Sequence, residues 1–198
     1  MRFKAGNCSF LLSFSFFAAT AIMITGGRSE IYLRILYFAF FHELGHAVAL
    51  KVFGYKILSV SLTAFGARIK CERFDDADNL EKALVWLSGA FVNLLFAAVF
   101  SVIGGYKREA ENNLLLALFN LLPYYDFDGW NAMLCITECF SVKNKTLFYI
   151  KHISSITVVL LFTSLNIILT LTEKPDIMLI FMNLYLVFGL MRYLKPSE

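Results

Sequence analysis

Long apolar runs separated by short polar connections make up most of the 198-residue chain. A helix of about 20 apolar residues spans the hydrocarbon core of a bilayer. The pattern predicts six membrane segments, at about residues 9–25, 31–50, 80–103, 112–140, 152–172 and 176–194. Pro123 should break the fourth helix, because proline removes a backbone donor and clashes with the preceding turn. We therefore expect an all-α polytopic membrane protein whose residues 1–198 form a single domain.

The connection between the second and third segments follows a different pattern. Apolar residues alternate with serine and threonine from Leu58 to Ala64, and alternation resumes from Arg68 to Glu72 beyond Gly66. A period of two is typical of strands. We expect a small β-hairpin near the cytoplasmic face, although an ordinary loop is the alternative. Residues 57–64 would be the edge that holds an extended substrate by β-augmentation.

Two interpretations of the first segment remain open. Arg2 and Lys4 precede it, and Ala19-Thr20-Ala21 resembles a signal-peptidase site. Further membrane segments follow at once, which favours a retained helix. Most of the 18 lysines and arginines fall on one side if the N-terminus is cytoplasmic, so the positive-inside rule predicts that orientation.

Composition agrees with a membrane protein. The chain is 59% hydrophobic and 17% charged, whereas soluble domains are nearer half apolar and a quarter charged. The net charge is only +3, and no basic patch is interleaved with aromatic residues. Nucleic acid is therefore not an expected partner.

Three ionisable residues interrupt the second apolar segment. His42 and His46 are four residues apart, so both project from one helical face and can share a metal ion. Glu43 lies one step round the helix, near a water on that metal, as in the H-E-x-x-H arrangement of zinc hydrolases. Zinc lowers the pKa of water, and the carboxylate takes the proton. The alternative is polar packing between helices, but intramembrane ionisable groups usually mark function.

A catalytic zinc usually takes three protein ligands, so one more must come from elsewhere in the chain. The candidates are His152, Asp126 and Asp128. His152 begins a predicted helix and is typical of an interfacial histidine. The aspartates follow Pro123, and a broken helix is tolerated inside a membrane where it lines a cavity. The depth of Asp128 in its segment agrees with that of the two histidines to within about one turn.

Taken together, these residues resemble the site-2 protease family of intramembrane zinc metalloproteases. The likeness covers HELGH at 42–46, SGAFVN at 88–93, and the N-x-x-P-x-x-x-x-D-G pattern at 120–129. The resemblance implies that zinc is bound by His42, His46 and Asp128. It also implies Glu43 as the general base and Asn93 as a group that holds substrate or the oxyanion near the metal.

The sequence departs from the family pattern at three places. Asp126 stands where proline is usual, Trp130 where a second glycine is common, and Ala90 replaces the proline before Asn93. None of these changes removes a ligand. Asp126 keeps the identity of the liganding aspartate open.

The resemblance implies hydrolysis of a peptide bond in or near the membrane segment of a membrane-tethered protein, such as a pro-sigma or anti-sigma factor. The sporulation proteases that process a pro-sigma factor are the most similar subgroup, with six segments, a short hairpin and no inserted PDZ domain. The expected partners are a tethered substrate, the lipid bilayer and membrane-protein regulators. The expected location is a bacterial cytoplasmic or forespore-surrounding membrane.

Two other functions are compatible with a polytopic protein of this composition. A metal-ion transporter would distribute its ligands along a path through the membrane, whereas these ligands gather at one depth. An inactive protease-like scaffold would not need intact ligands and Glu43. Both alternatives would largely survive a Glu43→Gln substitution, and a protease would not.

Overall fold

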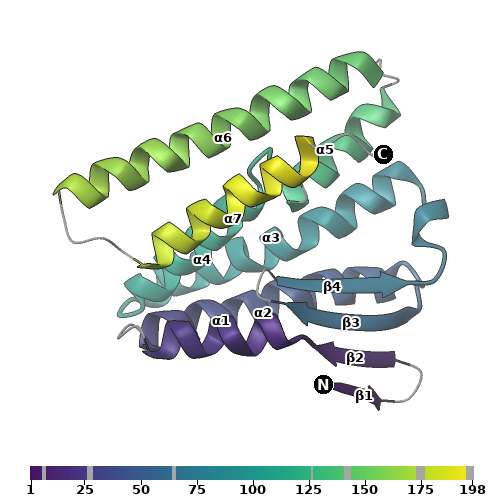
Figure 1. Ribbon diagram of the computed structural model, residues 1–198. Helices are drawn as coiled ribbons and strands as arrows, with labels where there is room; N and C mark the ends of the chain where they lie inside the picture. Colours follow the sequence, from purple (N-terminus) through teal and green to yellow (C-terminus); the bar gives the residue numbers. More distant parts are fainter. Residues whose placement is uncertain are drawn as a thin grey trace.

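The computed structural model describes residues 1–5, 8–25, 29–63, 66–125, 127–140, 144–172 and 177–194. In these ranges the chain is mostly helical, with one small sheet (Figure 1). The strands are β1 (Arg2–Ala5), β2 (Cys8–Leu12), β3 (Ile57–Thr63) and β4 (Gly66–Cys71). The helices are α1 (Phe14–Thr25), α2 (Ser29–Val52), the 3-10 helix η1 (Phe74–Asp76), α3 (Asn79–Ile103), α4 (Lys107–Asn120), α5 (Asp128–Cys139), α6 (Asn144–Thr172) and α7 (Ile177–Leu194).

Three helices in the described ranges are long and apolar enough to cross a bilayer, namely Glu30–Val52, Asn79–Ile103 and Thr146–Thr172. The apolar part of α7, Leu179–Arg192, is shorter. The prediction of a largely helical chain with apolar helices long enough to span a bilayer is confirmed. Six full-length spans are not confirmed, because the first, fourth and sixth predicted segments contain only shorter apolar helices.

The N-terminal region corrects the all-α prediction. Residues 8–12 were expected to begin a helix, but they form β2, which pairs antiparallel with β1 and parallel with β3. α1 begins only after Ser13, whose backbone N–H donates to Leu62 O at 3.0 Å. The Ser13 hydroxyl also accepts the Phe16 N–H at 3.2 Å. Pairing with a distant strand overrides the local apolar pattern here, as β propensity depends strongly on context.

The predicted hairpin is present, but its free edge lies elsewhere. β3 and β4 pair antiparallel, with Val60 opposite Ile69. The sheet order is β1-β2-β3-β4, so β3 has a partner on each side. The prediction that 57–64 forms the free edge is therefore wrong for the described residues 57–63, and Ala64 lies outside the described ranges. β4 is the edge strand beside the helices.

The fourth segment is broken as expected. α4 ends at Asn120 and α5 begins at Asp128. Between them Pro123 is followed by a tight turn in which the Phe127 N–H donates to Tyr124 O at 3.0 Å. The break lets Asp128 stand at the first turn of a new helix, where the helix dipole favours a carboxylate.

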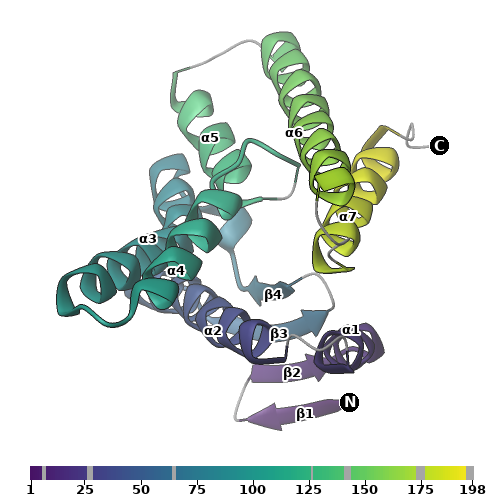
Figure 2. The same cartoon turned by 90° about the vertical axis from the view of Figure 1, so that its left-hand side faces the viewer.

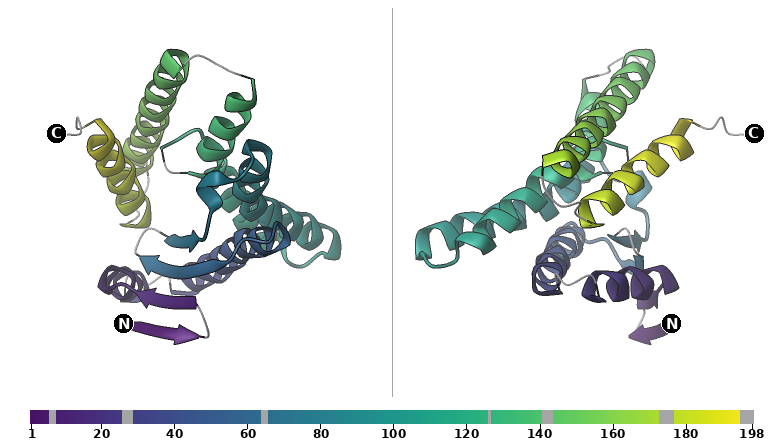
Figure 3. Two further views of the ribbon diagram at one scale, coloured as in Figure 1. Left: turned by 90° about the vertical axis from the view of Figure 1, so that its right-hand side faces the viewer. Right: turned by 60° about the vertical axis from the view of Figure 1, so that its left-hand side comes forward.

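α3 is the central helix and packs against α2, α4 and α5. Figures 2 and 3 show α6 and α7 as a pair set to one side of this group. An apolar cluster joins the pair to the broken segment; its buried members are Tyr124, Phe127, Val158, Val159 and Leu186. The turn that delivers Asp128 is therefore supported from the side of α6 and α7.

Candidate metal centre

Three polar side chains meet in the interior between α2 and α5. His42, His46 and Asp128 are buried, with 4%, 8% and 8% of their surface exposed. The Oδ2 atom of Asp128 lies 2.8 Å from His42 Nε2 and 3.2 Å from His46 Nε2. The two Nε2 atoms are 3.3 Å apart. The structure thus brings the three predicted ligands to one point.

The other nitrogen of each imidazole faces an oxygen atom of α3. His46 Nδ1 lies 2.7 Å from the carbonyl oxygen of Val85, which can only accept a hydrogen bond. His42 Nδ1 lies 2.7 Å from Asn93 Oδ1. Each Nδ1 must therefore carry a proton and donate it. In the neutral rings both Nε2 atoms then present bare lone pairs, the state in which histidine binds a metal.

The donor set fits a cation. Two Nε2 lone pairs and one carboxylate oxygen all lie within 4.8 Å of one another, and none of them brings a hydrogen. Such groups repel unless a proton or a cation lies between them. Two imidazoles with one carboxylate also form a known ligand set of catalytic zinc, which leaves a fourth position open. The residues present therefore fit a zinc ion.

Two glycines make the space for this cluster. An ideal Cβ on Gly89 would lie 2.6 Å from His42 Nε2 and closer still to His46 Nε2. A Cβ on Gly45 would lie 2.8 Å from Ser88 O on α3. α2 and α3 therefore cross at a distance that only glycine permits, and α3 forms one wall of the cluster.

Glu43 lies beside the cluster and is not one of its three members. Its Oε1 accepts the Ala67 N–H at 3.4 Å, a long contact between α2 and β4. The side chain is partly exposed. Its role as the general base stays a prediction.

Asn93 is fully buried on α3, with 0% exposed surface. In addition to its contact with His42, its Nδ2 lies 3.0 Å from Asn113 Oδ1 and 3.4 Å from Phe38 O. Its role as an oxyanion donor stays a prediction, and a substrate contact would require one of these bonds to break. Asn113 was not among the predicted site residues. The only sequence signal for it is an amide at the start of an apolar run.

Two residues weighed as ligands lie outside this cluster. The His152 ring is on α6, and its Nδ1 donates to Phe148 O at 2.7 Å, one turn earlier. His152 is not a member of the metal-ligand group found in the described residues. Asp126 lies outside the described ranges, so its role stays a prediction.

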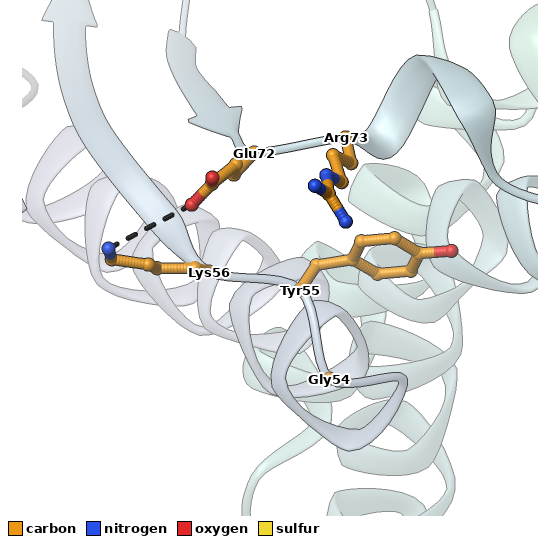
Figure 4. Close-up of a pocket in the computed structure, with 5 residues that line it drawn as sticks. All are labelled: Gly54, Tyr55, Lys56, Glu72 and Arg73. Atoms are coloured by element: carbon orange, nitrogen blue, oxygen red, sulfur yellow. Dashed lines mark ion pairs between the residues drawn. The ribbon is translucent and has the colours of Figure 1, made fainter.

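An open pocket of about 390 Å³ lies beyond the C-terminal end of α2. It is lined by Gly54, Tyr55, Lys56, Glu72 and Arg73 (Figure 4). Lys56 and Glu72 form an exposed ion pair at 3.8 Å. The Tyr55 hydroxyl donates to Glu81 at 2.6 Å, and this bond raises the pKa of Tyr55 to about 12. None of the three cluster residues lines this pocket.

Comparison with known proteins shows which proteins the chain resembles. Residues 31–109 match the family described as Peptidase family M50. The fold is similar to that of the solved site-2 protease from Methanocaldococcus jannaschii, with a TM-score of 0.70 and 18% identity. That comparison covers 100% of this chain and 96% of the other, and it shows a shared fold.

A curated relative gives a more specific likeness. The chain is 31% identical over 117 residues to stage IV sporulation protein FB of Bacillus subtilis (strain 168). The match covers 55% of this chain and 41% of that protein, so the match spans about two fifths of its relative. The family match and this relative agree with the resemblance that the motifs predict, and the structural match agrees with it in fold.

Proposed function

We propose that the protein is an intramembrane zinc metalloprotease that cleaves a membrane-tethered protein in or near its membrane segment. The observation that carries the proposal is the buried meeting of His42, His46 and Asp128, whose ligand atoms all lie within 4.8 Å of one another. The family match over HELGH supports the same activity. Zinc, when bound, acts as a Lewis acid that polarises a carbonyl and lowers the pKa of water.

Glu43 is the proton carrier in this proposal. It is one helical step from His42, and its side chain is partly exposed, whereas His42, His46 and Asp128 are buried. It accepts a proton from the attacking water and returns it to the leaving nitrogen, as general acid–base catalysis requires. Its weak contact with the Ala67 N–H leaves the second carboxylate oxygen available for that exchange.

The substrate is proposed to bind as a strand on the outer edge of β4. The Ala67 N–H points away from β3, toward Glu43, whereas the Arg68 carbonyl faces Ser61 of β3. Groups alternate along a strand, so the N–H and C=O of Ile69 also face the free edge. An unwound substrate segment paired there would run past Glu43, and main-chain bonds would hold it.

A proline at Ile69 tests this edge. Proline is tolerated where the backbone N–H faces away from the neighbouring strand, so Ile69→Pro removes one edge donor and keeps the β3–β4 ladder. A hydrogen bond is worth about 1 kcal/mol net, so we expect kcat/KM to fall about fivefold with zinc content unchanged. Ile69→Val keeps the N–H and is the control. Equal turnover in both variants would exclude β4 as the docking edge.

The nature of the substrate and its regulation extend the same proposal. The likeness to a sporulation protein supports a tethered transcription-factor precursor, such as a pro-sigma or anti-sigma factor. We also propose a cytoplasmic N-terminus, a bacterial cytoplasmic or forespore-surrounding membrane, and control by membrane-protein regulators. The excess of basic residues in the connections assigned to the cytoplasm supports that orientation.

Transport of metal ions and a scaffold role are less well supported. In the described part of the chain the only group of three metal-ligand side chains is the one at His42, His46 and Asp128. A transport path would need further ligands at other depths. A scaffold would have no use for a carboxylate held beside the cluster.

The deciding experiment is Glu43→Gln, with co-expressed single-span or hairpin-anchored candidate substrates. Loss of a general base costs about 10²- to 10⁴-fold in rate, so cleavage should vanish on gels while zinc content stays near one per chain. Glu30→Gln is the control, because Glu30 lies at the other end of α2 with an exposed side chain that pairs only with Arg34 in the described structure. Cleavage that persists in Glu43→Gln would overturn the proposed mechanism.

A further inference from the structure

Asn113 of α4 is as deeply buried as Asn93, with 0% of its surface exposed. Its Oδ1 accepts the Asn93 Nδ2 hydrogen at 3.0 Å. Its own Nδ2 donates to the carbonyl oxygen of Glu109, one turn earlier, at 2.8 Å. Asn113 therefore belongs to a chain of bonds that runs from the α4 backbone through Asn93 to His42.

The direction of every bond in this chain is fixed by backbone carbonyls. Glu109 O can only accept, so Asn113 must turn its NH₂ group toward it and its Oδ1 toward Asn93. Phe38 O also only accepts, and it lies on the same side of Asn93 Nδ2. Asn93 must then turn its Oδ1 toward His42. The positions of the oxygen and nitrogen atoms in both amides therefore follow from the backbone carbonyls that they face.

The two histidines are oriented by different means. His46 donates to the Val85 carbonyl, a backbone group held by α3 itself. His42 donates to a side-chain amide, whose orientation depends on its other partners, the shorter contact to Asn113 Oδ1 at 3.0 Å and the longer one to Phe38 O at 3.4 Å. A flipped Asn93 would favour the opposite tautomer of His42 and leave a hydrogen on Nε2, which blocks metal binding.

We propose that Asn113 is a positioning residue for the metal centre. It holds Asn93 in the one orientation in which His42 keeps its proton on Nδ1 and presents the Nε2 lone pair to the metal. This inference rests on the proposed zinc site. Partners of this kind typically change metal affinity by about 10- to 100-fold when they are removed.

The test measures zinc affinity by competition with a chromogenic chelator in detergent, with no substrate present. Asn113→Leu removes the acceptor at similar volume, and we expect zinc affinity to fall by about 10-fold or more. In its protonated form Asn113→Asp keeps an oxygen facing Asn93 and an O–H that can donate to Glu109 O, and we expect affinity within about threefold of the wild type. Asn166→Leu is the matched control, because Asn166 donates to Leu179 O between α6 and α7.

A second readout separates orientation from packing. Cobalt in place of zinc gives visible absorption bands that depend on ligand geometry, and we expect them to change in Asn113→Leu and to be restored in Asn113→Asp. Should Asn113→Leu fail to fold, Asn113→Ala removes the amide without added bulk and carries the same expectations.

Two outcomes would overturn the inference. One is wild-type zinc affinity in the leucine or alanine variant, and the other is an equal loss in the aspartate variant, which would indicate packing alone. Both leave the proposed protease intact, provided that Glu43→Gln abolishes cleavage. A wild-type protein that binds no zinc would instead refute the proposed function, and this inference with it.

Discussion

The helices α2 to α5 and the pair α6–α7 are built on different principles. In the first group, buried side chains of three helices form a connected chain of hydrogen bonds, as His42, Asn93 and Asn113 do. In the described residues of the pair, the interhelical polar contacts include two separate ones, Thr163 with Asn183 and Asn166 with Leu179 O. These two contacts agree with the packing role expected of isolated amides in membrane helices.

The two regions should therefore differ in how strongly a substitution affects zinc binding. The side chains around His42 and His46 are hydrogen-bonded to one another and packed against glycines, so none of them can move without breaking a bond to the next. A single contact outside this cluster can be lost without moving the metal-ligand side chains. Two glycines that face polar atoms, Gly89 on α3 and Gly189 on α7, allow a direct comparison of the two cases.

The largest effect is expected for Gly89→Ala. The new Cβ would lie within contact distance of both Nε2 atoms, 2.6 Å from that of His42, and the rings are held from behind by Asn93 and Val85. The methyl group therefore occupies the space of the metal. We expect zinc affinity to fall by more than about 100-fold, above the range for loss of one outer partner, as measured by chelator competition.

Gly189→Ala is the contrasting control. Its Cβ would meet the Tyr124 hydroxyl at 2.6 Å, and that hydroxyl donates to Leu186 O. The methyl group would displace this hydroxyl within the apolar cluster and not at the metal-ligand side chains, so we expect a loss of about 1–3 kcal/mol in unfolding free energy and unchanged zinc affinity. Equal zinc loss in both variants would refute the contrast between the regions.

The sequence predicts the metal-ligand cluster because the patterns that indicate it each lie within a short stretch of the chain. His42 and His46 are spaced by one helical turn, and Pro123 marks the break that frees Asp128. The closeness of Asn93 to the site is implied only by the resemblance of the Ser-Gly-Ala-Phe-Val-Asn segment to the site-2 protease family. These features depend on residues within a few positions of one another.

Other features depend on distant partners and could not be predicted in this way. Residues 8–12 are apolar enough for a helix, and only the parallel pairing with β3 makes them a strand. That pairing also moves the free edge from β3 to β4. Asn113 carries no local signal, because its role depends on Asn93 of another helix.

The smallest effect is expected for Thr163→Val. The Thr163 hydroxyl donates to Asn183 Oδ1 at 3.0 Å across α6 and α7, and valine keeps the shape but removes the donor. Interhelical hydrogen bonds in membranes average about 0.6 kcal/mol, so unfolding in detergent should shift by that order while cleavage and zinc content stay at wild-type levels. Ser164→Ala, which removes only a bond within α6, is the control. A zinc loss in Thr163→Val would mean that the pair α6–α7 is coupled to the metal centre as tightly as α3 is, and the distinction between the two regions would fail.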